Sequence, residues 1–68
     1  MGRDKISLKA ARVNAGYTLD EAADLMGIST NKLWRWEQNP EIIPIAFKDT
    51  IQDTYHMSID NIIFLSRN

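Results

Sequence analysis

Between residues 30 and 38 the chain gathers side chains suited to recognising the edges of nucleic acid bases. Asn and Gln can bond adenine, Arg can donate two hydrogen bonds to guanine, and Thr can contact a thymine methyl group or a phosphate. The residues of these types are Thr30, Asn31, Arg35 and Gln38, with Lys32 among them. This set indicates binding chemistry rather than bond-breaking chemistry.

Candidates for catalysis or metal binding are few. With no cysteine and one histidine, His56, the chain lacks the ligands of a closed zinc or iron-sulfur site. Asp49 and Asp53 are four residues apart on an expected helix, but no convergent nucleophile is evident, so we interpret them as a solvated face. We interpret His56 as a surface or capping residue. We therefore predict no enzymatic activity, metal, cofactor or small-molecule substrate.

Sixty-eight residues allow one small domain, 1–68, because a chain of this length buries only about 60% of its surface on folding. Its composition, 44% hydrophobic and 25% charged, is that of a globular protein. No apolar stretch reaches the roughly 18 residues of a membrane-spanning helix, and no signal peptide is evident. Together with the absence of cysteine, this predicts a cytoplasmic protein that does not enter a membrane.

Charge is unevenly distributed along a chain whose net charge is -1. Residues 1–35 carry six Lys or Arg against four Asp or Glu, a net +2, whereas residues 36–68 carry two against five, a net -3. Any basic surface that attracts phosphates is therefore expected on the N-terminal half.

Five helices are expected to position these side chains, over about residues 7–14, 18–26, 30–38, 44–55 and 58–68. Thr18-Leu19-Asp20-Glu21 is a capping box that starts the second helix, and Ser29 caps the third. Gly16 and Gly27 end the first two. Pro44 belongs in the first turn of the fourth. Sustained period-two alternation is missing, so we predict an all-α fold, with a short extended tail at 63–66 as the one alternative.

Residues 18–38 have the pattern of a helix-turn-helix unit, whose second helix can enter the major groove of DNA. Ala22 and Ala23 allow the two helices to approach closely, and Gly27 turns the chain. Leu33 and Trp36 anchor the second helix to the core, so Trp36 is predicted to be buried. The opposite side then holds Asn31, Trp34, Arg35 and Gln38, with Thr30 at the N-terminal tip and Lys32 on one flank.

Several stretches resemble the Xre/Cro/CI-type helix-turn-helix family, and the length and the closing segment are similar to those of small Cro-type regulators of bacteriophages. The stretches are Leu8-Lys9-Ala10-Ala11-Arg12, Thr18-Leu19-Asp20-Glu21-Ala22-Ala23, Leu25-Met26-Gly27-Ile28-Ser29, Leu33-Trp34-Arg35-Trp36-Glu37 and Ser58-Ile59-Asp60-Asn61-Ile62-Ile63-Phe64. The resemblance implies a compact five-helix domain of the lambda-repressor-like type. It also implies a sequence-specific transcriptional regulator, Cro-like and of phage or prophage origin, that binds double-stranded operator DNA.

The same resemblance assigns roles to residues. It places Thr30, Asn31 and Arg35 on base-contacting positions and Lys32 and Gln38 near the backbone or bases. Thr18 falls at a phosphate-contacting helix start, and a structural salt bridge is expected between Arg12 and Glu37. Two further DNA contacts are hypotheses from residue type: Lys9 as a cation for phosphates, and Trp34 as an indole against the groove wall. For Trp34, packing against residues 40–43 of its own chain and anchoring of a protein partner are open alternatives.

A homodimer is expected, because one such unit buries too little to bind DNA tightly alone. The dimer is expected to be weak, and its formation on DNA alone is an open alternative. Four consecutive apolar residues offer the expected interface: Ile62, Ile63, Phe64 and Leu65. The alternative is that all four pack inside their own domain.

A second function class stays open, in which the fold serves as a protein-protein interaction module that regulates a repressor or polymerase. Leu19 stands where the family often has a phosphate-binding Gln, and Glu41 stands where it often has a basic residue. Both departures remove ionic contacts to DNA. With the net charge of -1, they favour the protein-binding alternative, whereas the basic N-terminal half favours DNA.

Overall fold

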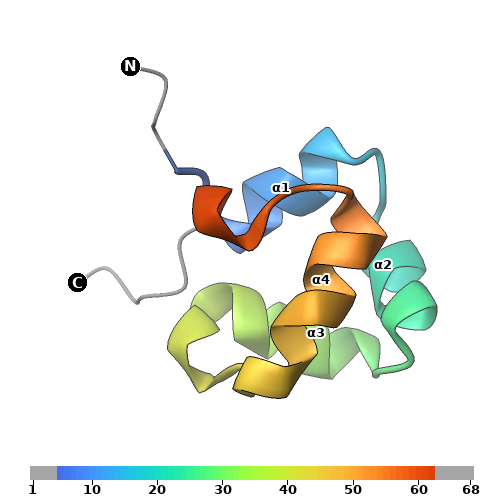
Figure 1. Cartoon of the computed structure of the whole chain (residues 1–68). Helices are drawn as coiled ribbons and strands as arrows, with labels where there is room; N and C mark the ends of the chain where they lie inside the picture. The colour runs from blue at the N-terminus through green and yellow to red at the C-terminus, as the bar shows by residue number, and fades with distance from the viewer. Residues whose placement is uncertain (1–4, 63–68) are drawn as a thin grey trace.

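A computed structural model of the chain describes residues 5–62, and every regular element in that range is helical. The four α-helices are α1 (Leu8–Asn14), α2 (Leu19–Met26), α3 (Thr30–Gln38) and α4 (Lys48–Tyr55) (Figure 1). Three 3-10 turns follow α3 or α4: η1 (Pro40–Ile42), η2 (Ile45–Phe47) and η3 (Ile59–Asn61). The predicted all-α class is confirmed.

The first three helices begin where the sequence places their caps. The Ser7 hydroxyl accepts from the Ala10 amide, and the Ser29 hydroxyl accepts from the Lys32 amide, each at 3.0 Å. At α2 the Thr18 hydroxyl accepts from the Glu21 amide while the Glu21 carboxylate accepts from the Thr18 amide. These bonds satisfy N–H groups that a helix start otherwise leaves unpaired, which fixes the starting point of each helix.

The core lies between the four α-helices, each of which contributes buried side chains to it. Small side chains at Ala22 and Ala23 are fully buried and let α3 approach, so that Leu33 is also fully buried. Trp36 is buried as predicted, and its ring meets that of Phe47 edge-on at a centroid distance of 4.7 Å. One stripe of α3 is thereby pinned to the core, which determines the face that it leaves to solvent.

The fourth helix is shorter than predicted. It starts at Lys48, and the residues before it form the 3-10 turn η2 instead of a first α-helical turn. Pro44 has an extended backbone with ψ 140°, and its carbonyl accepts from the Phe47 amide at 2.9 Å. This i to i+3 bond is the tighter pattern of a 3-10 turn.

The predicted five-helix count is not confirmed: the segment after Ser58 forms one 3-10 turn, η3, within the described residues, and residues 63–68 of the predicted fifth helix lie outside them. Ile62 is already extended and forms an isolated parallel bridge with Ile6, whose amide donates to the Asn61 carbonyl at 3.0 Å. β-Branched side chains have reduced helix propensity, and pairing with Ile6 offers the backbone another partner. The expected extended tail at 63–66 lies outside the described residues.

The burial of Ile62 corrects the prediction that this residue belongs to a dimer interface. Ile62 is buried in the core of its own chain, so its side chain has no surface to offer a partner. The other three expected interface residues, Ile63, Phe64 and Leu65, lie outside the described residues. Among the helices within 5–62, none combines the length and apolar character needed to cross a membrane.

Candidate nucleic-acid interface

The outward face of α3 carries the polar side chains predicted to recognise bases. Asn31, Arg35 and Gln38 are exposed, and Trp34 lies among them with 50% of its surface open to solvent. Leu33 and Trp36 point the other way and are buried. Successive side chains of a helix are rotated by 100°, so residues on opposite sides of α3 face opposite ways. Because Leu33 and Trp36 are held in the core, the four side chains on the other side all face solvent.

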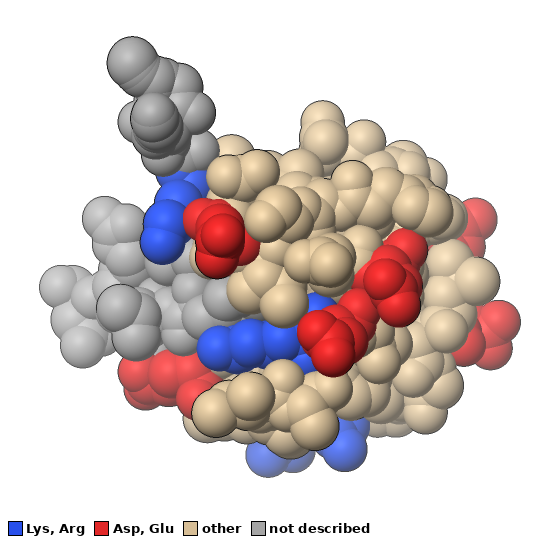
Figure 2. Space-filling model, in the orientation of Figure 1, with Lys and Arg blue, Asp and Glu red and all other residues tan. Residues whose placement is uncertain are grey.

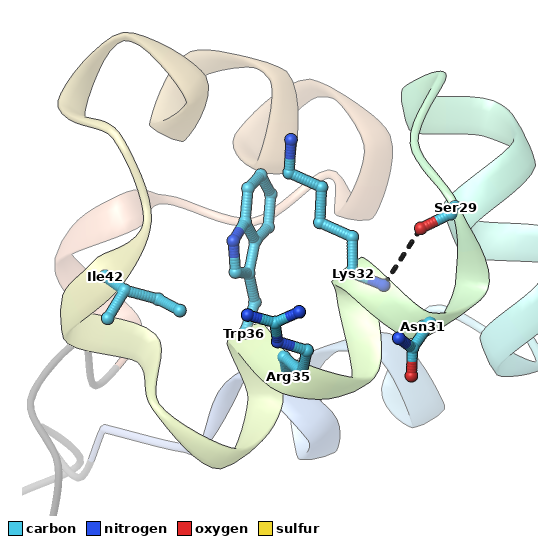
Figure 3. Close-up of a pocket in the computed structure, with 6 residues that line it drawn as sticks. All are labelled: Ser29, Asn31, Lys32, Arg35, Trp36 and Ile42. Carbon is cyan, nitrogen blue, oxygen red and sulfur yellow. Dashed lines mark hydrogen bonds between the residues drawn. The ribbon is translucent and has the colours of Figure 1, made fainter.

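Lys32 lies on the flank of α3 and extends along the indole of Trp36. Its ammonium group is 5.6 Å from the ring centroid, within the range of a cation–π contact. In Figure 3 the Lys32 and Trp36 side chains extend from α3 in the same direction, whereas Asn31 points away from them. Lys32 therefore presents its charge at the side of α3.

A hollow of about 300 Å³ lies beside α3 and brings together three of the predicted residues, Asn31, Lys32 and Arg35 (Figure 3). Its remaining lining comes from Ser29, Trp36 and Ile42. Two cationic side chains therefore border a recess whose wall is partly aromatic and aliphatic. Such a recess suits a sugar-phosphate segment, whose phosphates attract the cations while its sugar packs on apolar surface.

The Thr30 hydroxyl at the N-terminal tip of α3 is already hydrogen-bonded within the chain. Its Oγ1 donates a 2.7 Å hydrogen bond to Oδ1 of Asp20, which lies in the first turn of α2. The starts of α2 and α3 are thus joined directly. We did not predict a recognition role for Asp20, although the sequence places it in the first turn of the helix that precedes Thr30.

Behind the outward face, α3 is tied to α1 by an ion pair. Nε of Arg12 donates to Oε2 of Glu37 at 2.8 Å, and Nη1 of Arg12 donates to the Tyr17 carbonyl at 3.0 Å. The bond to Glu37 raises the pKa of Arg12, and burial acts in the opposite direction. The salt bridge predicted between Arg12 and Glu37 is therefore present, and it holds the C-terminal turn of α3.

Charges on the visible surface are mixed and do not form one continuous basic field. Figure 2 shows acidic side chains at several places on this face, and Lys or Arg side chains at its upper left, near its centre and at its lower edge, the side on which α3 lies in Figure 1. Asp49 and Asp53 are exposed on α4, as a solvated face requires. No group of three potential metal ligands occurs within residues 5–62.

The remaining predicted contacts lie outside the hollow. Thr18 caps α2, and Lys9 is exposed on α1. Trp34 and Gln38 are on the outward face of α3 but do not line the recess. Ser29 and Ile42 do line it and were not predicted to do so: Ser29 was predicted only as the cap of α3, and Ile42 belongs to the turn η1 that follows α3.

Comparison of the chain with models of protein families, with curated proteins and with solved structures gave no match. The function of this chain is therefore inferred from the geometry of α3 and its surroundings.

Proposed function

We propose that the chain is a sequence-specific DNA-binding transcriptional regulator, a Cro-like repressor of phage or prophage origin, in which α2 and α3 act as a helix-turn-helix unit and α3 reads operator DNA in the major groove. One observation carries the proposal: α3 is anchored by Leu33 and Trp36 while its opposite face exposes side chains that match base edges. A helix of nine residues with one face exposed has the dimensions to enter that groove.

Within this proposal the residues divide by chemistry. Arg35 and Asn31 are exposed on the outward face and suit guanine and adenine edges respectively. Lys32 lies at the flank, where its charge suits a phosphate beside the groove. Lys9 and Thr18 belong to α1 and to the start of α2, so they suit phosphates on the neighbouring backbone.

Operator binding is expected to involve two copies of the chain, with two recognition helices about 34 Å apart in successive major grooves. The partner in this proposal is a second protomer on a pseudo-palindromic site. The mixed surface charge supports a modest number of phosphate contacts, so the salt dependence of binding is expected to be clear but moderate.

The test is a gel-shift titration of the full chain against the DNA that lies upstream of its own coding sequence, at low and moderate salt. Arg35→Ala is expected to lower operator affinity about 5- to 150-fold and to relax preference at one base position. Lys48→Ala removes one positive charge from α4 and is the charge-matched control, for which we expect little change in affinity. Absence of binding to this DNA, or equal loss by both variants, would contradict the proposal.

A second candidate is the protein-protein interaction module. Ile45 is 82% exposed and Ile42 is also exposed, so the segment between α3 and α4 presents apolar surface next to the recess. Apolar surface of this kind is a common mark of protein interfaces. Two measurements distinguish the candidates. Operator affinity that Ile45→Ser leaves unchanged supports DNA recognition by α3. Absence of DNA binding by the wild-type chain favours the protein partner.

A further inference from the structure

The hydrogen bond between Thr30 and Asp20 limits what the tip of α3 can offer to a base. A threonine hydroxyl has one hydrogen, and in this structure it is donated to Oδ1 of Asp20 at 2.7 Å. The Thr30 oxygen therefore keeps acceptor capacity but no hydrogen for an outside partner. Its methyl group remains apolar.

Asp20 adds further acceptors at the same place. It is an exposed residue, and a carboxylate that receives one hydrogen bond still has a second oxygen with no hydrogen of its own. The junction of α2 and α3 thus presents acceptors from two side chains. A base that meets this junction has to supply the hydrogen.

The four bases differ in whether they can do so. In the major groove cytosine presents an amino group, while guanine presents two acceptors and thymine an acceptor and a methyl group. Adenine has an amino group too, but it lies between two acceptors, its own N7 and the thymine O4, whereas the cytosine amino group has an acceptor on one side only, the guanine O6. Cytosine is the base that fits best.

We propose that Asp20 is a specificity-determining residue that, together with Thr30, selects cytosine at the base pair facing the start of α3. The proposal rests on the function proposed above and names one base preference within it. Asp20 also places a negative charge close to the expected DNA contact, where it repels phosphates of any sequence. Its predicted overall effect is weaker binding to random DNA and stronger discrimination between sites.

Asp20→Asn is the informative substitution, since it keeps the size of the side chain and can keep the bond to Thr30. The amide oxygen can accept the Thr30 hydroxyl while the amide nitrogen presents hydrogens outward. The junction then offers a donor in place of an acceptor. The preferred base is expected to change from cytosine to guanine or thymine.

Asp24→Asn is the matched control. Asp24 is exposed on the same helix, one turn further on, and borders a different hollow with Gly16 and Tyr17. Asp24→Asn makes the same change in charge as Asp20→Asn without altering the junction of α2 and α3. Thr30→Val supplies a second, independent perturbation, because it removes the hydroxyl and keeps a side chain of similar shape.

The experiment is selection of bound duplexes from a randomised DNA pool by the full chain and by each variant, after circular dichroism has established that each is folded. The wild-type chain is expected to enrich sites with cytosine at one position per half-site. Asp20→Asn is expected to lose that preference by about tenfold, with guanine or thymine rising in its place, and to bind random DNA more tightly. Thr30→Val is expected to lose the same cytosine preference, and Asp24→Asn to retain it.

The outcomes separate the inference from the proposed function. A wild-type motif that Asp20→Asn and Thr30→Val both leave unchanged overturns the role of Asp20 and leaves DNA recognition standing. The same loss with Asp24→Asn as with Asp20→Asn also overturns it, because a general charge effect then explains the result. No enriched motif with the wild-type chain overturns both.

Discussion

The guanidinium group of Arg12 on α1 and the carboxylate of Glu37 in the last turn of α3 meet in a two-point contact. Nε lies 2.8 Å from Oε2 and Nη2 lies 3.4 Å from Oε1, although the residues are 25 positions apart in sequence. The side chains are only 10% and 4% exposed. The pair therefore fixes how the proposed recognition helix lies against the rest of the domain.

Arg12→Ala is expected to lower the free energy of unfolding by about 3 to 5 kcal/mol, because it leaves the Glu37 carboxylate buried without its partner. A domain of this size rarely has more than that in total, so the variant is expected to be largely unfolded at room temperature. Urea and thermal unfolding followed by circular dichroism measure the change. A loss below about 0.5 kcal/mol would mean that the pair contributes little.

The control for that prediction replaces both partners. Arg12→Met combined with Glu37→Leu removes both charges and fills a similar volume with apolar groups, so the double variant is expected to be more stable than Arg12→Ala alone. If the two are equally unstable, the loss comes from packing and not from the unpaired carboxylate.

Tyr55 predicts a dependence of stability on alkaline pH. Its ring is buried, and its hydroxyl has no hydrogen-bond partner among the described residues. Burial of the phenol, reinforced by the negative charge of Glu37, raises the pKa of Tyr55 above its ordinary value of about 10. The folded chain therefore holds this proton more tightly than the unfolded chain does.

The contribution of Tyr55 is fully present below pH 10, where the tyrosine is neutral in both states. Above pH 10 the unfolded chain loses the proton first, so the free energy of unfolding falls by about 1.4 kcal/mol per pH unit until the folded pKa is reached. Urea unfolding between pH 8 and pH 11.5 measures this slope. Tyr55→Phe is expected to remove this component and to change stability at pH 7 by less than about 1 kcal/mol.

Tyr17→Phe provides the comparison, since it removes the other tyrosine of the chain, whose ring lies 6.4 Å from that of Tyr55. The alkaline loss of stability is expected to persist in this variant. An identical pH profile for Tyr55→Phe and the wild-type chain would contradict the assignment to Tyr55.

The two tryptophans are expected to respond oppositely to substitution. Trp36→Ala removes a buried indole and its edge contact with Phe47, so a loss of about 3 to 5 kcal/mol in stability is expected. Trp34→Ala removes a half-exposed side chain and is expected to change stability by less than about 1 kcal/mol while weakening operator binding. Unfolding and DNA titrations of the two variants measure both quantities.

Fluorescence adds a direct reading of Trp34. In a Trp36→Phe background the emission comes from Trp34 alone, and it is expected to change when operator DNA is added. An unchanged signal at saturation counts against a DNA contact. Lowered stability in Trp34→Ala would instead mean that the indole packs against its own protein, and no change in either property would favour a protein partner.

Dimerisation is expected to depend on residues after Ile62, since Ile62 itself is committed to the core. Phe64→Ser is expected to weaken association and operator binding together, and circular dichroism checks that the variant is folded. Sedimentation with and without operator DNA measures the number of protomers. One protomer per operator at saturation would rule out the dimer.

Local sequence signals determined where the first three helices begin and which side of α3 is buried. Ser7, Thr18 and Ser29 cap neighbouring amides three residues away, and the spacing of Leu33 and Trp36 sets the buried stripe. Such interactions depend on residues within one turn of one another, so they can be recognised in a linear sequence. The Arg12–Glu37 pair was predicted from the family resemblance and not from local signals.

Tertiary structure decided the features that join distant segments. The parallel pairing of Ile6 with Ile62 replaces the expected start of a fifth helix, and a 3-10 turn places Phe47 against Trp36. The bond from Thr30 to Asp20 likewise depends on how α2 crosses α3. In each case a contact across the fold selects among local conformations whose energies differ little, and local sequence signals do not specify which segments meet.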